Sequence, residues 1–126
     1  MNTFSLGEID RVAGRIIAHV VAEKASGVAL SGDLGVGKTT LAQALGKQLG
    51  VTVPIVSPTF ILVRTYSATH ALFKKFVHSD AYRIETDKEA QGLHLTSEPG
   101  SFLCVEWPDK LGVHIPDKLV PLSLSY

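Results

Sequence analysis

One cysteine is all that this chain of 126 residues contains, so no internal disulfide can form. Cys104 lies in the apolar run 102–105, which predicts a buried and unreactive thiol. No apolar stretch reaches the roughly 18 residues that a membrane-spanning helix needs. The first ten residues also lack the basic and apolar regions of a signal peptide. These absences predict a protein of a reducing, cytoplasmic compartment.

The chain also lacks an excess of charge of either sign. Twelve basic residues balance twelve acidic ones, so no overall field attracts nucleic acid or an anionic membrane. We therefore expect no membrane association and no strong autonomous binding of nucleic acid. Hydrophobic residues make up 45% of the chain, which is typical of a folded globular protein. The length predicts a single domain over residues 1–126.

Hydrophobic spacing in the first part of the chain predicts a helix, a strand and a second helix. Ser5 and Glu8 match a capping box, and apolar residues recur behind them at helical spacing, which predicts a helix over 6–24. The short apolar run 28–30 is typical of a buried parallel strand. The segment 39–49 then predicts a helix that stops before a glycine.

The rest of the chain is richer in strand-forming residues. β-Branched and aromatic residues at 61–66 and 72–78 predict a hairpin, and a weak helical pattern covers 87–93. Short apolar runs at 102–105 and 119–124 predict two further strands. This order predicts an α/β fold with a mostly parallel central sheet, an antiparallel hairpin and helices on both faces.

A glycine-rich segment between the first predicted strand and the second predicted helix matches G-x-x-x-x-G-K-[ST] at every fixed position. The segment and the residue after it are Gly32, Asp33, Leu34, Gly35, Val36, Gly37, Lys38, Thr39 and Thr40. The glycines allow the backbone to curl and to present N–H groups to an anion. Lys38 supplies an ammonium for the β- and γ-phosphates, and the Thr39 hydroxyl suits Mg²⁺. The segment therefore predicts a P-loop that binds ATP or ADP with Mg²⁺.

Two acidic residues are candidates to complete this site. Glu106 follows the apolar run 102–105, where a carboxylate can complete the magnesium shell or orient water at the carboxyl ends of the strands. A solvated glutamate at a strand edge is the alternative. Asp80 follows the second strand of the predicted hairpin. Its position alone does not separate a metal ligand from a turn-forming aspartate.

Three further residues have two interpretations each. Thr59, in the loop Ser-Pro-Thr-Phe, is placed either as a switch hydroxyl near the γ-phosphate or as a turn threonine. Tyr82 and Trp107 are either core aromatics or contacts of the nucleotide. Their spacing leaves both interpretations open.

Four segments together resemble one family. GDLGVGKTT at Gly32, SPTF at Ser57, HSDAYR at His78 and VEWPD at Val105 occur in the order found in bacterial TsaE (YjeE) proteins, the P-loop ATPases of tRNA threonylcarbamoyladenosine synthesis. The P-loop is shared by many families, whereas the other three segments together are specific. The resemblance covers most of the chain from the P-loop to residue 109 and implies a P-loop NTPase fold.

The resemblance also implies roles for the candidate residues. Lys38 would act in catalysis as well as in phosphate binding, and Glu106 would be the Walker B-type acid that holds Mg²⁺. Asp80 would join the metal or water network. Thr59 would sense the γ-phosphate, and Trp107 would lie beside the nucleotide site.

The family resemblance further implies a function and partners. Such proteins work with the TsaD–TsaB pair, which transfers a threonylcarbamoyl group to the adenosine beside the anticodon of certain tRNAs. The TsaE-like protein does not perform the transfer; its binding and slow hydrolysis of ATP permit successive turnovers. The balanced charge agrees with this role, because the partners would hold most of the tRNA.

Two features depart from the family pattern. Val36 stands where the family usually has alanine. The valine side chain is larger than that of alanine, but the change removes no phosphate ligand. The chain also ends at Tyr126, where relatives typically carry a further C-terminal strand or tail. We expect either a truncated C-terminus or a shorter sheet edge, with the nucleotide site intact.

Other functions of a P-loop fit the sequence less well. A small-molecule kinase needs an arginine-rich lid, but no such segment accompanies the four arginines, Arg11, Arg15, Arg64 and Arg83. A regulatory GTPase would show a guanine-reading N-K-x-D segment after the D-x-x-G match at 109–112, and none follows. Nucleotide binding without hydrolysis remains an alternative within the family.

Overall fold

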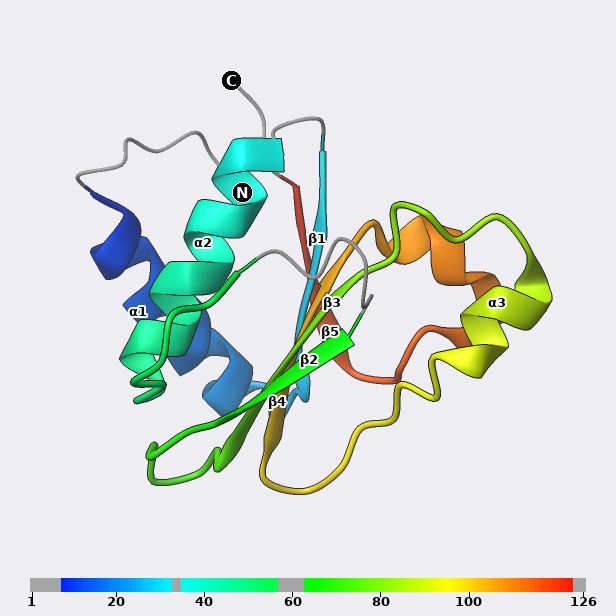
Figure 1. The fold of residues 1–126 in the computed structure, drawn as a ribbon. Helices are drawn as coiled ribbons and strands as arrows, with labels where there is room; N and C mark the ends of the chain where they lie inside the picture. Colours follow the sequence, from blue (N-terminus) through cyan, green and yellow to red (C-terminus); the bar gives the residue numbers. More distant parts are fainter. Residues whose placement is uncertain (1–7, 33–34, 57–62, 124–126) are drawn as a thin grey trace.

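A β-sheet of five strands forms the centre of the part of the chain that the structure describes (Figure 1). The structure is a computed structural model, and it describes residues 8–32, 35–56 and 63–123. The elements in chain order are α1 (Ile9–Ala22), β1 (Gly27–Ser31), α2 (Gly35–Gln48), β2 (Val63–Ser67), β3 (Lys75–Asp80), α3 (Asp87–Gly92), β4 (Ser101–Glu106), the 3₁₀ helix η2 (Pro108–His114) and β5 (Leu119–Ser123).

The strand order of the sheet is β2-β3-β4-β1-β5. β1 pairs in parallel with both β4 and β5, and β3 pairs in parallel with β4. Only β2 runs the other way, as the antiparallel partner of β3 at the sheet edge. The predicted fold class, a mostly parallel sheet with an antiparallel hairpin, is therefore confirmed.

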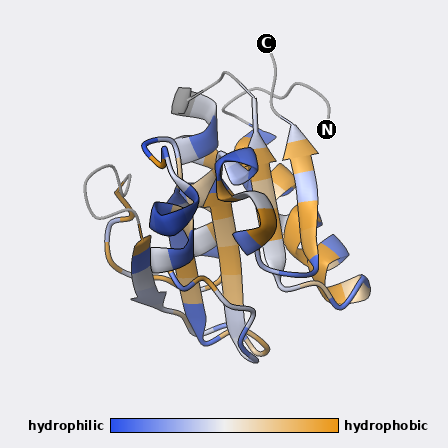
Figure 2. Ribbon diagram, turned by 90° about the vertical axis from the view of Figure 1, so that its right-hand side faces the viewer, coloured by the Kyte–Doolittle hydropathy of each residue, from blue (hydrophilic) through white to orange (hydrophobic). Residues whose placement is uncertain are grey.

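Helices cover both faces of the sheet, as predicted. In Figure 1, α1 and α2 lie side by side on one face, and α3 and η2 lie on the other. One apolar core fills the space between α1, α2 and the sheet, and a second lies beneath α3 and η2. Every residue of β4 is buried, because a central parallel strand is covered on both faces. Figure 2 shows the apolar colour concentrated on the central strands.

Helix α1 is shorter at both ends than the predicted helix over 6–24. Glu8 occupies the N-cap position and makes no side-chain cap hydrogen bond, while Ser5 lies outside the described residues. The expected capping box between Ser5 and Glu8 therefore falls partly outside the described residues and stays a prediction. At the other end Lys24 adopts a left-handed conformation with φ 54°, which stops the helix before the glycine that was expected to end it.

Helix α2 begins at Gly35, four residues before its predicted start at Thr39. The prediction treated the whole glycine-rich segment as a loop, but its second half forms the first turn of the helix. The first N–H groups of α2 therefore belong to the glycine-rich segment itself. These groups have no hydrogen-bond partner within the helix, because the first four N–H groups of any helix lack one.

The other predicted elements are present with shifted ends. The hairpin strands are Val63–Ser67 and Lys75–Asp80, so Asp80 is the last residue of β3 rather than the residue that follows it. The apolar runs form β4 and β5, and the weak helical pattern forms α3. Cys104 is fully buried in β4, and burial raises the pKa of its thiol well above the ordinary value, as an unreactive cysteine requires.

None of the helices in the described ranges has both the length and the apolar character that crossing a bilayer requires. The predicted extent of a single domain, 1–126, stays a prediction.

Candidate functional site

The phosphate-loop segment connects the end of β1 to the start of α2. Gly32 has φ 114°, a conformation open to glycine, and it turns the chain away from the strand. Lys38 lies in the first turn of α2, and its side chain is 0% exposed. The Lys38 Nζ donates a 2.6 Å hydrogen bond to the carbonyl oxygen of Gly32, so the ammonium closes the loop back on its own beginning. Asp33, Leu34 and Thr59 lie outside the described residues.

The aromatic ring of Trp107 covers the Lys38 ammonium. The Nζ atom lies 3.8 Å from the ring centroid, a cation–π distance. Tyr82 contacts Trp107 in turn, with the ring centroids 5.0 Å apart and the ring planes tilted by 54°. Tyr82 is 57% exposed, so it is no core residue. Trp107 lies beside Lys38 and also packs against the second apolar core, so its contact with a nucleotide stays a prediction.

Backbone hydrogen bonds tie three strand ends together beside this loop. The Trp107 N–H donates to the carbonyl of Leu30 at 3.1 Å, and the Ala81 N–H donates to the carbonyl of Glu106 at 3.0 Å. Trp107 adopts φ 57°, which turns the chain sharply as β4 ends. The carboxyl ends of β1, β3 and β4 therefore meet at one edge, the usual ligand position in a parallel sheet.

Glu106 ends β4 opposite Asp80 of β3 in the parallel register. Glu106 lies at the carboxyl ends of the strands, as the sequence suggested, but it is almost completely enclosed, with 2% of the residue exposed. Its Oε2 lies 2.5 Å from the Nε2 atom of His78, which is itself fully buried. The alternative of a solvated glutamate at a strand edge is therefore wrong.

The sequence prediction missed His78. It singled out Asp80 and Tyr82 in the segment HSDAYR, yet alternate residues of a strand share one face. Because Asp80 ends β3, His78 two residues earlier lies on the same face, and the pairing of β3 with β4 brings it to Glu106. The period-two pattern could have nominated this histidine, but not the carboxylate that it contacts.

Burial raises the pKa of Asp80 above its ordinary value, and the negative charge of Glu106 acts in the same direction. Three contributions oppose this rise: a hydrogen bond from the Tyr82 backbone N–H to Oδ1 at 3.0 Å, and the charges of His78 and Lys38. The cations and carboxylates of the site are thus electrostatically coupled. A cation beside the two acidic residues would lower the cost of keeping both ionised.

These side chains fit a magnesium-bound polyphosphate. The Lys38 ammonium has three donors, one of which bonds to the Gly32 carbonyl, and no described carboxylate lies within ion-pair distance of it. Mg²⁺ is usually held by one or two carboxylates together with phosphate oxygens and water, a donor set that Asp80, Glu106 and the Thr39 hydroxyl can supply. Among the described residues, no group of three or more His, Cys, Asp or Glu side chains is placed to hold a metal ion.

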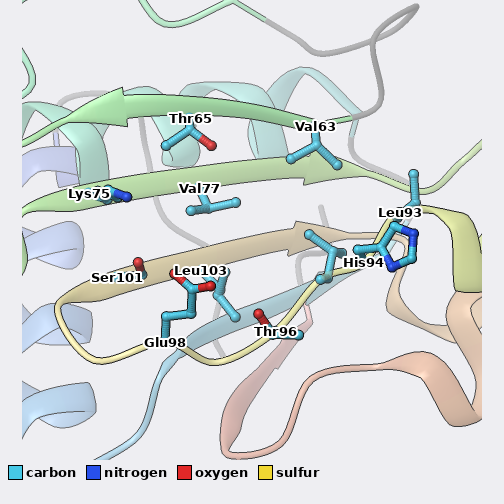
Figure 3. Close-up of a pocket in the computed structure, with 11 residues that line it drawn as sticks. Val63, Thr65, Lys75, Val77, Leu93, His94, Thr96, Glu98, Ser101 and Leu103 are labelled. Atoms are coloured by element: carbon cyan, nitrogen blue, oxygen red, sulfur yellow. The ribbon is translucent and has the colours of Figure 1, made fainter.

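A separate pocket of about 180 Å³ lies on the opposite face of the sheet (Figure 3). Its floor includes Val63, Val77 and Leu103 of three neighbouring strands, and Leu93 and Thr96 follow α3 along its rim. None of the predicted site residues lines it. It is therefore distinct from the phosphate-loop site.

Comparison with known proteins gives one consistent match. The model of the family described as threonylcarbamoyl adenosine biosynthesis protein TsaE matches residues 4–126. A Nostoc protein named tRNA threonylcarbamoyladenosine biosynthesis protein TsaE is 38% identical over 106 residues, 79% of this chain and 62% of that protein. The protein of the same name from Haemophilus influenzae is 30% identical over 125 residues, 98% of this chain and 77% of that protein.

The chain is shorter than some of these relatives. It spans 62% of the Nostoc protein and 55% of the Synechocystis protein of the same name, to which it is 40% identical over 90 residues. The match to the family model nevertheless covers the strands and helices that build the phosphate-loop site. Because this model fits nearly the whole chain and the Haemophilus relative aligns over almost all of it, the chain belongs to the TsaE family.

Proposed function

We propose that this chain binds ATP with Mg²⁺ at its phosphate loop and hydrolyses it slowly in support of tRNA threonylcarbamoyladenosine synthesis. The observation that carries the nucleotide site is the buried Lys38 ammonium, which no described carboxylate neutralises. Burying a cation is costly unless a ligand or partner compensates it, and a polyphosphate is the anion that the loop and the helix N-terminus suit. The biosynthetic role rests on the family and on the names of its relatives.

Each side chain has a distinct task in this proposal. Lys38 binds the β- and γ-phosphates, and Thr39 with Asp80 and Glu106 holds Mg²⁺. A magnesium ion held by these residues would supply positive charge that offsets the charge of the phosphates. Glu106 orients the attacking water, and Trp107 flanks the bound phosphates through its contact with the lysine. We further propose that the TsaD–TsaB pair is the partner of this chain. In this proposal the pair binds the tRNA and itself transfers the threonylcarbamoyl group.

Replacement of the phosphate-loop lysine tests the nucleotide site. Lys38→Ala removes a charge-assisted hydrogen bond of roughly 1.5–3 kcal/mol, so we expect ADP affinity to fall about 10- to 100-fold in magnesium buffer. Isothermal titration calorimetry measures the change. Lys47→Ala on the same helix is the control, because Lys47 is exposed and forms only a surface ion pair with Asp10. Equal ADP affinity in the two variants would contradict the site.

A tRNA modification assay tests the biosynthetic role. We expect threonylcarbamoyladenosine formation by a reconstituted TsaD–TsaB system to need this chain for repeated turnover. Glu106→Gln should support less turnover while it still binds ADP, because the amide keeps the shape and loses the charge. Rapid phosphoryl transfer to a small metabolite instead would identify a kinase. Nucleotide binding with no hydrolysis, alone or with partners, would reduce the function to a binding switch.

A further inference from the structure

The contact between His78 and Glu106 has a closely defined geometry. Both side chains are buried, and the distance from Nε2 to Oε2 is 2.5 Å. The other ring nitrogen of His78, Nδ1, is buried and has no hydrogen-bond partner among the described residues. The two ring nitrogens therefore differ: Nε2 contacts the Glu106 carboxylate, whereas Nδ1 contacts no hydrogen-bonding group that the structure describes.

This asymmetry selects one form of the ring. A proton on Nδ1 would have no acceptor among the described residues, and proteins rarely leave a buried N–H donor without one. A proton on Nε2 instead donates directly to the Glu106 carboxylate. The arrangement that fits these surroundings therefore carries a proton on Nε2, with Glu106 accepting.

The neighbours of the ring restrict its movement. Phe76 lies two residues before His78 on the same strand, with the ring centroids 6.1 Å apart. His78 also pairs in register with Cys104 of β4, a fully buried position. An imidazole enclosed in this way has few other orientations, so it can hold its partner still.

We propose that His78 is a positioning residue: its Nε2–H holds Oε2 of Glu106, so that the carboxylate offers its other oxygen to the magnesium and water of the nucleotide site. This inference rests on the proposed function for its catalytic consequence, but the hydrogen bond can be tested without nucleotide. Glu106 touches the reaction, whereas His78 acts through it. Partners of this kind orient a metal ligand and are commonly worth about 10- to 100-fold in activity or metal affinity.

Nuclear magnetic resonance of the metal-free, nucleotide-free protein tests the contact directly. The ¹⁵N shifts of the His78 ring should show a proton on Nε2. A ring whose Nε2 carries no proton would overturn the assignment. Because this measurement uses the wild-type protein without ATP, its result does not depend on whether the proposed ATPase function is correct.

A matched pair of variants tests the positioning role. In His78→Gln the amide nitrogen reaches about as far as Nε2, whereas in His78→Asn it reaches only about as far as Nδ1. We expect His78→Asn to lower kcat for ATP hydrolysis about 10- to 100-fold with KM within about twofold, and His78→Gln to restore most of it. His114→Gln, which alters an exposed pair with Asp87, is the control.

ADP affinity gives a second readout that needs no catalysis. His78→Asn should bind ADP as the wild type does in EDTA, but should lose about tenfold or more of the gain in affinity that Mg²⁺ provides. Melting curves establish that both variants are folded. If folded His78→Asn and His78→Gln match each other in kcat and in the effect of Mg²⁺, the positioning role is wrong. If the wild type hydrolyses no ATP but the NMR and magnesium results hold, the proposed hydrolysis alone fails.

Discussion

At the scale of single residues, the site consists of charged groups that are buried at some energetic cost. Lys38 and Glu106 are both almost completely enclosed, and each has one close polar partner, Gly32 and His78 respectively. Asp80 lies beside them with a raised pKa. Buried charged groups gathered at the carboxyl ends of neighbouring strands are typical of functional sites.

Asp80→Asn should therefore stabilise the nucleotide-free protein near neutral pH. Because the pKa of Asp80 is raised above 3.8, the folded state binds the proton more tightly than the unfolded chain does. The contribution of Asp80 to the free energy of unfolding therefore falls as pH rises from 3.8 through the raised pKa of the folded state. It stays low at every pH above that pKa. The amide carries no charge and can still accept the Tyr82 N–H.

Melting temperatures measured in EDTA from about pH 3 to about pH 7 test this expectation. The difference between Asp80→Asn and the wild type should be close to zero at the acidic end and grow in favour of the variant as pH rises. A difference that stays constant across the range, or that favours the wild type at neutral pH, would show that ionisation of Asp80 carries no such cost. Asp109→Asn is a control, since Asp109 is exposed.

At the scale of elements, the site depends on the pairing of β1 with β4. The two strands run in parallel with Gly27 opposite Leu103, and the Leu103 N–H donates to the carbonyl of Ser26 just before β1. This pairing brings the end of β4, with Glu106, next to the start of the phosphate loop. The approach at Gly27 is so close that a side chain has no room there.

Gly27→Ala should destabilise the protein by about 3 kcal/mol or more. An added Cβ would lie 1.9 Å from the carbonyl oxygen of Leu103, and the glycine has φ 151°, which side chains disfavour. Gly14→Ala is the matched control. It lies inside α1 with nothing within 4 Å of an added Cβ, so it should stabilise by about 0.5–1 kcal/mol. Urea denaturation measures both, and a destabilisation by Gly27→Ala of less than about 1 kcal/mol would contradict the close packing.

Local sequence signals predicted the existence of the elements better than their ends. The capping box predicted at Ser5 and Glu8 involves a residue outside the described ranges, whereas α3 begins at an N-cap that the sequence analysis did not name. There the Thr86 side chain accepts the Glu89 N–H at 3.1 Å, and the Thr86 hydroxyl donates to the Glu89 carboxylate at 3.1 Å. The pattern S/T-x-x-E thus marks the start of α3.

At the scale of the whole molecule, one end of the sheet carries the site and both faces carry apolar cores. The strand order places β1 between β4 and β5, so the phosphate loop follows an interior strand of the sheet and not an edge strand. Ligand binding at a junction of three strand ends and α2 should therefore stabilise the fold as a unit.

Mg·ADP should raise the melting temperature of the protein. A ligand that binds only the folded state at about 100 times its dissociation constant stabilises by about 2.7 kcal/mol, or on the order of 10 °C for a chain of this length. Differential scanning calorimetry measures the shift. Lys38→Ala should abolish most of it, and Lys47→Ala should retain it. No shift for the wild type at saturating Mg·ADP would contradict nucleotide binding at any site that needs the folded chain.

Contiguous stretches of this sequence determined the phosphate loop and the class of fold. The loop needs only neighbouring residues, because glycine, lysine and threonine act through local backbone geometry, and the alternation of helical and strand periods limits the fold to a mostly parallel sheet. Only the tertiary structure decided that His78 holds Glu106, 28 residues later, and that Trp107 covers Lys38. Contacts of that kind depend on which strands pair and in which register, and register is set by the packing of the whole core rather than by any local pattern.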